Sequence, residues 1–230
     1  MTMRSRIVEN RRSERIRAFD DSAEEYEKWY CEEPGATICE CEIKAVKPFV
    51  PQGLGVEVGV GTGVFASKLK TQVGVDAALA SIKIAKKRGV EVVQGTAEAL
   101  PFKDLCFDYV TSILVIEFLE DPESSFREAW RILKYGGSII TCFIPRNSDW
   151  GILYSKKKAE GHRVYRHANF YDSVQVKKML QNAGFIVGRC LATLSQRPDS
   201  VTCAEEPCDE VGNHGFVYIR GKKTKYARAR

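Results

Sequence analysis

Apolar residues recur along this chain at two alternating spacings, one typical of strands and one typical of helices. From Leu54 onward, short apolar blocks predict strands at 54–58, 72–76, 91–94, 107–113 and 138–144. Between these blocks, apolar residues three and four positions apart predict helices, and one helix carries Phe126, Ala129, Trp130 and Leu133. Such strict alternation predicts crossover units on a parallel sheet.

The segments on either side of this alternation follow other patterns. Residues 1–18 are charged and weakly patterned, whereas residues 19–50 predict two helices interrupted at Pro34–Gly35. Gly136–Gly137 is expected to end the helix that Asp121 begins. Beyond 138–144, the pattern breaks at 145–171 and then predicts a helix around Val176–Ala183, followed by an antiparallel strand pair at 185–194 and 215–220.

Composition changes this picture little. The length of 230 residues predicts one or two domains. The hydrophobic content of 44% is that of a globular protein with a real core. The net charge of +5 comes largely from basic residues near the two ends: Arg4, Arg6, Arg11, Arg12, Arg15, Arg17, Lys222, Lys223, Lys225, Arg228 and Arg230. We expect frayed, solvated ends, although basic tails can also bind nucleic acid or anionic membrane.

Targeting signals and metal motifs are both weak in this sequence. The basic start is followed by no apolar segment, and no apolar run approaches the ~20 residues of a membrane span, so a cytosolic, soluble protein is expected. The eight cysteines are scattered. The pairs Cys39/Cys41 and Cys203/Cys208, with His214 nearby, only loosely approach zinc-site spacing, so no metal is expected.

The strongest chemical signal is the run of glycines directly after the 54–58 strand. Gly59, Gly61 and Gly63 alternate there, and Glu57 precedes the first glycine by two positions. Glycines let a ligand approach the backbone closely. Asp76 ends the next strand, where a carboxylate can accept hydrogen bonds from ribose hydroxyls. The pattern predicts a cofactor that contains a nucleoside.

The glycine spacing distinguishes among nucleoside cofactors. A nicotinamide-binding loop has two residues before its third glycine, but this chain has one, and no Gly-Lys-Ser/Thr of a P-loop is present. Glu-x-Gly-x-Gly-x-Gly instead resembles motif I of class I S-adenosylmethionine-dependent methyltransferases. Further stretches resemble that family in the same order, namely 19–29, 95–102, 107–110, 114–122 and 131–137. They cover about residues 19–190, and the subgroup most resembled is that of the ubiquinone/menaquinone biosynthesis methyltransferases.

The resemblance implies an α/β fold of the Rossmann-like type. Such a fold has a seven-stranded, mostly parallel sheet with an antiparallel last strand and helices on both faces. Residues 1–50 would form an N-terminal helical lid or extension. Residues 51–230 would form the methyltransferase domain, with a substrate-covering insertion at about 145–171.

The resemblance also assigns residues around the methionine part of S-adenosylmethionine. Gly59, Gly61 and Gly63 match positions whose backbone meets that part of the cofactor. Glu57 matches the acidic residue that orients the loop and the cofactor's amino group. Leu114 matches a backbone position that faces the methionine end.

Around the nucleoside, the resemblance assigns Asp76 to the ribose and Ala77 to the adenine. Thr96 and Ala97 match an Asp-Ala pair whose carboxylate often holds the adenine amino group. Thr96 departs from that pattern because its hydroxyl accepts one hydrogen bond but brings no charge.

No catalytic residue is assigned, because methyl transfer from a sulfonium expels a neutral leaving group. Glu117 follows the fourth strand and is interpreted as structural rather than as a base, and Phe118 stands where the family often has a histidine. His162 and His167 are interpreted as surface residues. Several aromatics suggest either plain packing or a cage for a planar or cationic substrate: Tyr26, Trp29, Tyr154, Tyr165 and Tyr171.

The predicted activity is methyl transfer to a small-molecule acceptor by in-line displacement, with S-adenosylhomocysteine as the product. One alternative is an RNA or protein methyltransferase that uses the basic ends. Residues 113–116 lack the Asn/Asp-Pro-Pro-Tyr of many RNA-base enzymes, which argues against that alternative. The other alternative is a non-catalytic module that binds S-adenosylmethionine. The sequence leaves the acceptor atom and the oligomeric state open.

Overall fold

The computed structural model describes residues 3–209 and 212–225, with side chains from Glu9 onward. Arg228, Arg230 and the side chains of Arg4 and Arg6 lie outside this range. The strands are β1 (Gly55–Val58), β2 (Val73–Asp76), β3 (Glu91–Gln94), β4 (Phe107–Ile113), β5 (Leu133–Phe143), β6 (Ile186–Thr193) and β7 (Phe216–Lys222). The α-helices are α1 (Met3–Asp20), α2 (Ala23–Trp29), α3 (Gly35–Val46), α4 (Val64–Leu69), α5 (Leu79–Lys87), α6 (Pro122–Ile132), α7 (Asp149–Ala159) and α8 (Ser173–Asn182). The short 3₁₀ turns are η1 (Lys47–Phe49), η2 (Ile116–Phe118) and η3 (Tyr165–His167).

All seven strands form one sheet in the order β3-β2-β1-β4-β5-β7-β6. The first five strands of this order pair in parallel, and β7 is antiparallel to both β5 and β6. The predicted Rossmann-like fold is therefore confirmed, including the antiparallel strand pair at the end. The order reverses between β1 and β4, and ligands of such sheets bind at the carboxyl ends of the strands near this switch point.

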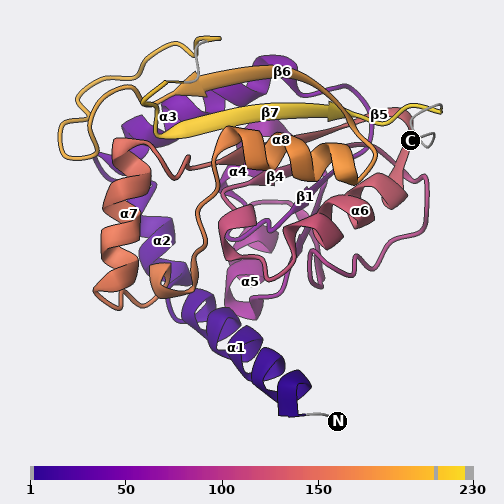
Figure 1. Ribbon diagram of the computed structural model, residues 1–230, viewed down its shortest axis with the longest axis horizontal. Coiled ribbons are helices and arrows are strands. Elements are labelled where there is room, and N and C mark those ends of the chain that lie inside the picture. The colour runs from indigo at the N-terminus through magenta and orange to yellow at the C-terminus, as the bar shows by residue number, and fades with distance from the viewer. Residues whose placement is uncertain (1–2, 210–211, 226–230) are drawn as a thin grey trace.

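Successive side chains of a strand point to opposite faces of the sheet. Both faces carry buried apolar side chains, and helices cover both. In β5, Ile139 and Phe143 join a core with α6 and α8, whereas Ile140 and Cys142 join a second core with α3, α4 and α7. In Figure 1, α6 and α8 lie in front of the central strands. No described helix has the length and apolar character required to cross a bilayer, and a cytosolic location stays a prediction.

The N-terminal segment is more ordered than its sequence pattern predicts. Residues 3–20 form the helix α1, which projects from the body of the molecule (Figure 1). Two contacts attach its last turn to the body. Asp20 Oδ1 accepts a hydrogen bond from Ala80 N at 2.6 Å, and the ring of Phe19 packs edge-on against that of Phe118, with ring centres 4.9 Å apart. The expectation of a frayed start is therefore wrong for this segment.

The glycine pair at 136–137 does not end a helix, which is a second correction. The helix α6 already ends at Ile132, and β5 runs through both glycines. Gly136 N donates to Lys223 O at 2.8 Å, and Lys223 N donates to Gly137 O at 2.9 Å. The strand is therefore extended backwards by this pairing with the later segment and by the pairing of Leu133 with Phe107 of β4.

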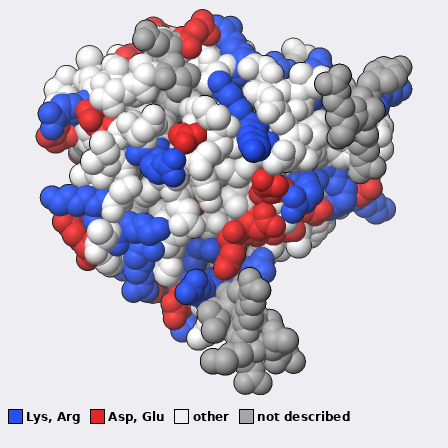
Figure 2. Space-filling view, in the orientation of Figure 1, with Lys and Arg blue, Asp and Glu red and all other residues white. Residues whose placement is uncertain are grey.

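Lys223 itself corrects the expectation of a solvated basic end. Its side chain is 1% exposed, and Nζ donates to Trp130 O at 2.6 Å and to Leu133 O at 2.7 Å. The ammonium also lies 3.9 Å from the centre of the Trp130 ring. A residue expected in a basic tail thus fastens the end of β7 to the end of α6. On the face of the molecule that Figure 2 shows, basic and acidic side chains are intermingled.

Candidate functional site

The glycine loop, residues 59–63, joins β1 to α4 at the carboxyl edge of the sheet. Gly59, Gly61 and Gly63 have φ angles of +73°, +51° and +78°, which favour glycine. A Cβ atom on Gly59 would lie 2.4 Å from Val115 Cγ2, whereas one on Gly61 would meet no atom within 4 Å. Gly59 is therefore required for packing, and Gly61 presents its backbone to open space.

Asp76 connects this loop to the next strand. Its Oδ2 accepts a hydrogen bond from Gly61 N at 2.8 Å, and its Oδ1 accepts one from Ala78 N at 2.8 Å. Burial raises the pKa of the carboxyl group. Each oxygen of a carboxylate has two acceptor positions. Asp76 can therefore shape the loop and still accept hydrogen bonds from a ligand.

Glu57 belongs to β1, two positions before the glycine loop, and is 2% exposed. Thr111 Oγ1 donates to its Oε2 at 3.4 Å, and burial raises the pKa of the carboxyl group to about 8. Glu57 is not among the residues that line the cavity described below. Its contacts are with Thr111 and the Ala66 backbone, so its role in orienting the loop and the cofactor's amino group stays a prediction.

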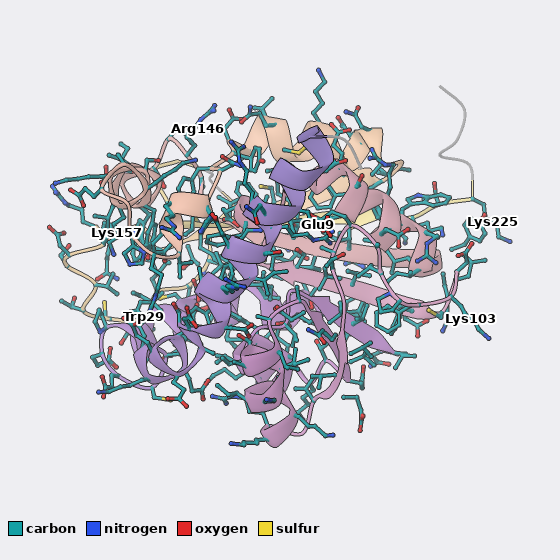
Figure 3. All side chains as sticks on the ribbon, turned by 90° about the horizontal axis from the view of Figure 1, so that it is seen from below. Glu9, Trp29, Lys103, Arg146, Lys157 and Lys225 are labelled. Carbon is teal, nitrogen blue, oxygen red and sulfur yellow. The ribbon has the colours of Figure 1, made fainter. Side chains whose placement is uncertain are left out.

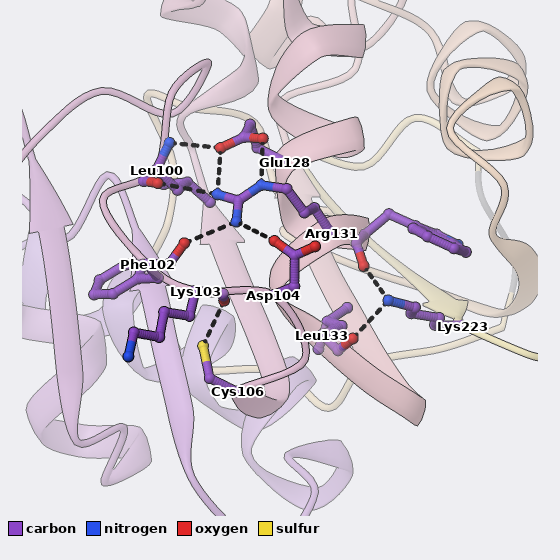
Figure 4. Close-up of polar contacts among 10 residues, drawn as sticks. Leu100, Phe102, Lys103, Asp104, Cys106, Glu128, Arg131, Leu133 and Lys223 are labelled. Carbon is purple, nitrogen blue, oxygen red and sulfur yellow. Dashed lines mark hydrogen bonds and ion pairs between the residues drawn. The ribbon is translucent and has the colours of Figure 1, made fainter.

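The segment that contains Thr96 and Ala97 is held from the side by a network around Arg131 of α6 (Figure 4). Arg131 donates to both carboxylate oxygens of Glu128 at 2.7 Å, to Asp104 Oδ1 at 2.8 Å and to Leu100 O at 3.0 Å. Glu128 Oε2 also accepts a hydrogen bond from Leu100 N at 2.8 Å. Planar, bidentate contacts of this kind fix geometry well, so α6 positions the loop after β3.

A cavity of about 820 Å³ opens at this edge of the sheet, within the range of about 300–1,000 Å³ typical of small-molecule sites. Seven of the residues assigned from the sequence line it: Gly59, Gly61, Asp76, Ala77, Thr96, Ala97 and Leu114. The other two, Glu57 and Gly63, do not line it. The structure thus brings residues from four separate loops to one hollow, and their individual roles stay predictions.

Aromatic side chains form much of the wall opposite the sheet. Tyr30 packs edge-on against Tyr26, Trp29 and Phe65, with ring centres 4.7 to 5.6 Å apart. Among the aromatics singled out from the sequence, four line the cavity: Tyr26, Trp29, Tyr154 and Tyr165. The fifth, Tyr171, packs instead against the core beside α6 and α8. Figure 3 shows Trp29 of α2 and Lys157 of α7 on the same side of the molecule.

Comparison with known proteins agrees with this geometry. The family model "Methyltransferase domain" matches residues 56–141. A crystal structure from Thermotoga maritima, described as an S-adenosylmethionine-dependent methyltransferase and possible histamine N-methyltransferase, superposes with a TM-score of 0.84. It shares 38% identity, over 91% of this chain and all of that one. The chain belongs to the S-adenosylmethionine-dependent methyltransferase family.

Two curated relatives extend the comparison. A Methanocaldococcus jannaschii protein is 40% identical over 208 residues, which is 90% of this chain and all of that protein. The demethylmenaquinone methyltransferase of Roseiflexus castenholzii is 35% identical over 105 residues, or 41% of this chain and 44% of that enzyme. The likeness to the quinone-modifying enzyme is therefore confined to less than half of either chain. The cofactor of the present methyltransferase is S-adenosylmethionine.

Glu117 does not line the cavity of this methyltransferase, although it follows β4. It is 1% exposed, and its Oε1 accepts a hydrogen bond from Ile144 N at 2.8 Å. Burial raises the pKa of this carboxyl group to about 7. Its contacts favour the structural interpretation over a catalytic one.

The predicted surface histidines differ in position. His162 lines the cavity beside Tyr165, with ring centres 4.9 Å apart, whereas His167 does not line it. Cys208 Sγ lies 3.5 Å from His214 Nε2. The described residues contain no group of three or more potential metal-binding side chains.

Sequence reasoning overlooked an ionisable residue that lies buried in the cavity wall, Glu42 of α3. It lines the cavity and is only 3% exposed. A signal was present in the sequence, because Glu42 lies four residues after Ile38 and three and four residues before Ala45 and Val46. An acidic residue thus interrupts the apolar stripe of an amphipathic helix, and such a residue requires an explanation.

Proposed function

We propose that this methyltransferase transfers a methyl group to a small-molecule acceptor by in-line displacement. The observation that carries the proposal is the cavity itself, which is bounded by the sheet edge on one side and by α1, α2, α3 and α7 on the other. A site covered in this way favours acceptors that can enter the hollow over those that must remain on the surface.

The residues at the sheet edge suit S-adenosylmethionine. Gly61 leaves space where a side chain would otherwise stand, and Asp76 retains acceptor positions for hydroxyl groups. Thr62 lines the same hollow, and its buried Oγ1 has no hydrogen-bond partner within the protein. These features give the methionine and ribose parts polar partners at one end of the cavity.

When bound, S-adenosylmethionine supplies a methyl group on a positively charged sulfur that leaves as a neutral thioether. The protein then has to hold the acceptor in line and exclude water. The aromatic wall formed by Tyr26, Tyr30, Tyr154 and Tyr165 suits both tasks. A general base is needed only if the acceptor must lose a proton during attack.

The charge distribution argues against the RNA or protein alternative. Arg12 Nη2 lies 3.7 Å from Glu98 Oε2, and Arg15 Nη1 lies 3.9 Å from Glu120 Oε2. Lys223 is buried. Several of the basic residues that would meet a polyanion therefore contact acidic or buried groups instead. The intermingled charges in Figure 2 are also unlike a continuous basic surface.

The first experiment is calorimetric titration of the protein with S-adenosylmethionine, S-adenosylhomocysteine and NADH. We expect binding of the first two only. Asp76→Ala should weaken it at least about 30-fold, because it removes a charged acceptor from two backbone amides and from the ligand. Asp108→Ala is the matched control, since Asp108 also accepts a backbone hydrogen bond, from Leu54 N, but does not line the cavity.

The second experiment follows transfer of labelled methyl from S-adenosylmethionine. Histamine is the first acceptor to test, because the Thermotoga maritima relative is described as a possible histamine N-methyltransferase. A small-molecule extract, total RNA and total protein are tested beside it. Label in the small-molecule fraction supports the proposal, whereas label in RNA or protein alone contradicts it. Cofactor binding without turnover would favour a non-catalytic module.

A further inference from the structure

Glu42 is a buried carboxyl group with an oxygen left unsatisfied on the wall of the cavity. The residue is 3% exposed, and its Oε2 has no hydrogen-bond partner within the protein. A buried polar atom without a partner costs roughly 1–3 kcal/mol, and more if it is charged. A bound ligand that donates a hydrogen bond to Oε2 would remove this cost.

The surroundings of Glu42 contain hydroxyl groups and rings rather than cations. Burial raises the pKa of Glu42 to about 8, and the hydroxyl of Tyr30, which lies beside the carboxyl group, partly offsets this rise. Tyr26 OH in turn donates to Tyr30 OH at 3.3 Å. Within residues 9–209 and 212–225, no basic side chain forms an ion pair with Glu42. The negative charge that this site can hold is therefore available to a ligand.

The same part of the cavity wall suits an organic cation for a second reason. Tyr26, Trp29 and Tyr30 stand together there. Tyr154 lines the cavity from α7, but Lys157 Nζ already lies 5.1 Å from the centre of its ring, so the cation-binding rings are those of α2 and its end. Ring faces attract a cation by about 0.5–2 kcal/mol, most strongly when the site is dry. A carboxylate surrounded by aromatic rings therefore offers one strong anchor and several weaker ones.

We infer that Glu42 binds a basic nitrogen of the acceptor, which makes the acceptor class a small organic cation with at least one N–H donor. This inference rests on the proposed small-molecule function and narrows it. Glu42 acts here as a binding residue that pairs with the acceptor's positive charge. The aromatic wall accommodates the acceptor's apolar body.

The test uses the full chain saturated with S-adenosylhomocysteine and titrated with matched probes. Tyramine and tryptamine carry an ammonium group, and tyrosol and tryptophol carry a hydroxyl group on the same ring systems. We expect at least one amine to bind at least about tenfold more tightly than its alcohol, because only the amine pairs with Glu42. Equal affinity of amine and alcohol, or no binding of either amine while S-adenosylhomocysteine binds, overturns the inference.

Glu42→Gln removes the charge at constant size. It should reduce amine affinity at least about tenfold and leave the affinities for the alcohols and for S-adenosylhomocysteine unchanged. Glu117→Gln is the matched control, since Glu117 is equally buried, also has an unpartnered Oε2 and does not line the cavity. An unchanged amine affinity in Glu42→Gln overturns the inference.

A measurement on the unmodified protein guards against a variant that fails to fold. At pH 7 an uncharged Glu42 must ionise to pair with an ammonium group, so amine binding should release roughly one proton. Titration in buffers of different ionisation enthalpy measures this release, and a value of zero overturns the inference. Failure of the protein to bind S-adenosylmethionine is a separate result, which contradicts the proposed function instead.

Discussion

Replacing Gly61 by alanine separates the cost of folding from the cost of binding. Gly61 has a φ of +51°, and a Cβ atom there would meet no protein atom within 4 Å. The added methyl group would therefore enter the cavity where the cofactor's methionine part is expected. No protein side chain has to move to receive it.

The folding cost of this substitution is only that of a left-handed backbone. For a residue other than glycine this strain is about 1–2 kcal/mol. In a chain of this size, such a loss lowers the melting temperature by roughly 2–8 °C. In Gly59→Ala the methyl group would instead lie 2.4 Å from Val115 Cγ2, so a larger loss is expected.

The binding cost of Gly61→Ala should come on top of its folding cost. Inserting a methyl group into a filled site costs typically 1–3 kcal/mol, which corresponds to about 5- to 150-fold weaker binding of S-adenosylmethionine. Gly89→Ala is the matched control, because Gly89 has a φ of +83° with no atom within 4 Å of its Cβ position, yet does not line the cavity. Thermal melts and calorimetric titration measure both quantities. If the two variants bind S-adenosylmethionine equally well, Gly61 does not face the cofactor and the placement is refuted.

Two further predictions concern buried charges. Burial raises the pKa of Glu117 from 4.5 to about 7, so between these pH values the folded state binds more protons and wild-type stability falls as pH rises. Glu117→Gln should flatten this decline by up to about 1.4 kcal/mol per pH unit. Urea unfolding at pH 5, 6 and 7 tests this, and an equal decline of the unfolding free energy with pH in the variant and the wild type would contradict it. Lys223→Met leaves the carbonyls of Trp130 and Leu133 without their buried donor and should cost about 2–4 kcal/mol. Urea unfolding measures this loss, and the affinity for the cofactor should not change. A variant as stable as the wild type would show that the Lys223 hydrogen bonds do not stabilise the fold.

The sequence pattern predicted the sheet and the position of the cofactor loop because both depend on local features. Alternating glycines after an apolar block require a tight turn at a strand end, and an acidic residue after the next strand falls on the same edge of a parallel sheet. Gly61 and Asp76 meet at this edge, where Gly61 N donates to Asp76 Oδ2 at 2.8 Å, while the contact of Asp76 with a ribose stays a prediction.

The features that were missed depend on contacts between distant segments. The helix α1 has no apolar stripe, but its end is held by Ala80, sixty residues away. The strand β5 starts early because Leu133 pairs with Phe107 of β4 and the glycines at 136–137 pair with Lys223. Glu42 belongs to a helix whose burial is decided by the sheet beneath it, so periodicity alone does not show that it lines a cavity.

The place of β7 has a consequence for how the molecule is synthesised. β7 comes last along the chain among the described strands, yet it lies between β5 and β6. A nascent chain that has emerged only as far as β6 therefore cannot complete its sheet. Until residues 216–222 are available, β5 keeps an open edge and β6 has no partner strand, only the single bridge between Ala192 and Cys208. Truncation before residue 216 should thus leave the cofactor loop encoded in full but expose unpaired strands that favour aggregation.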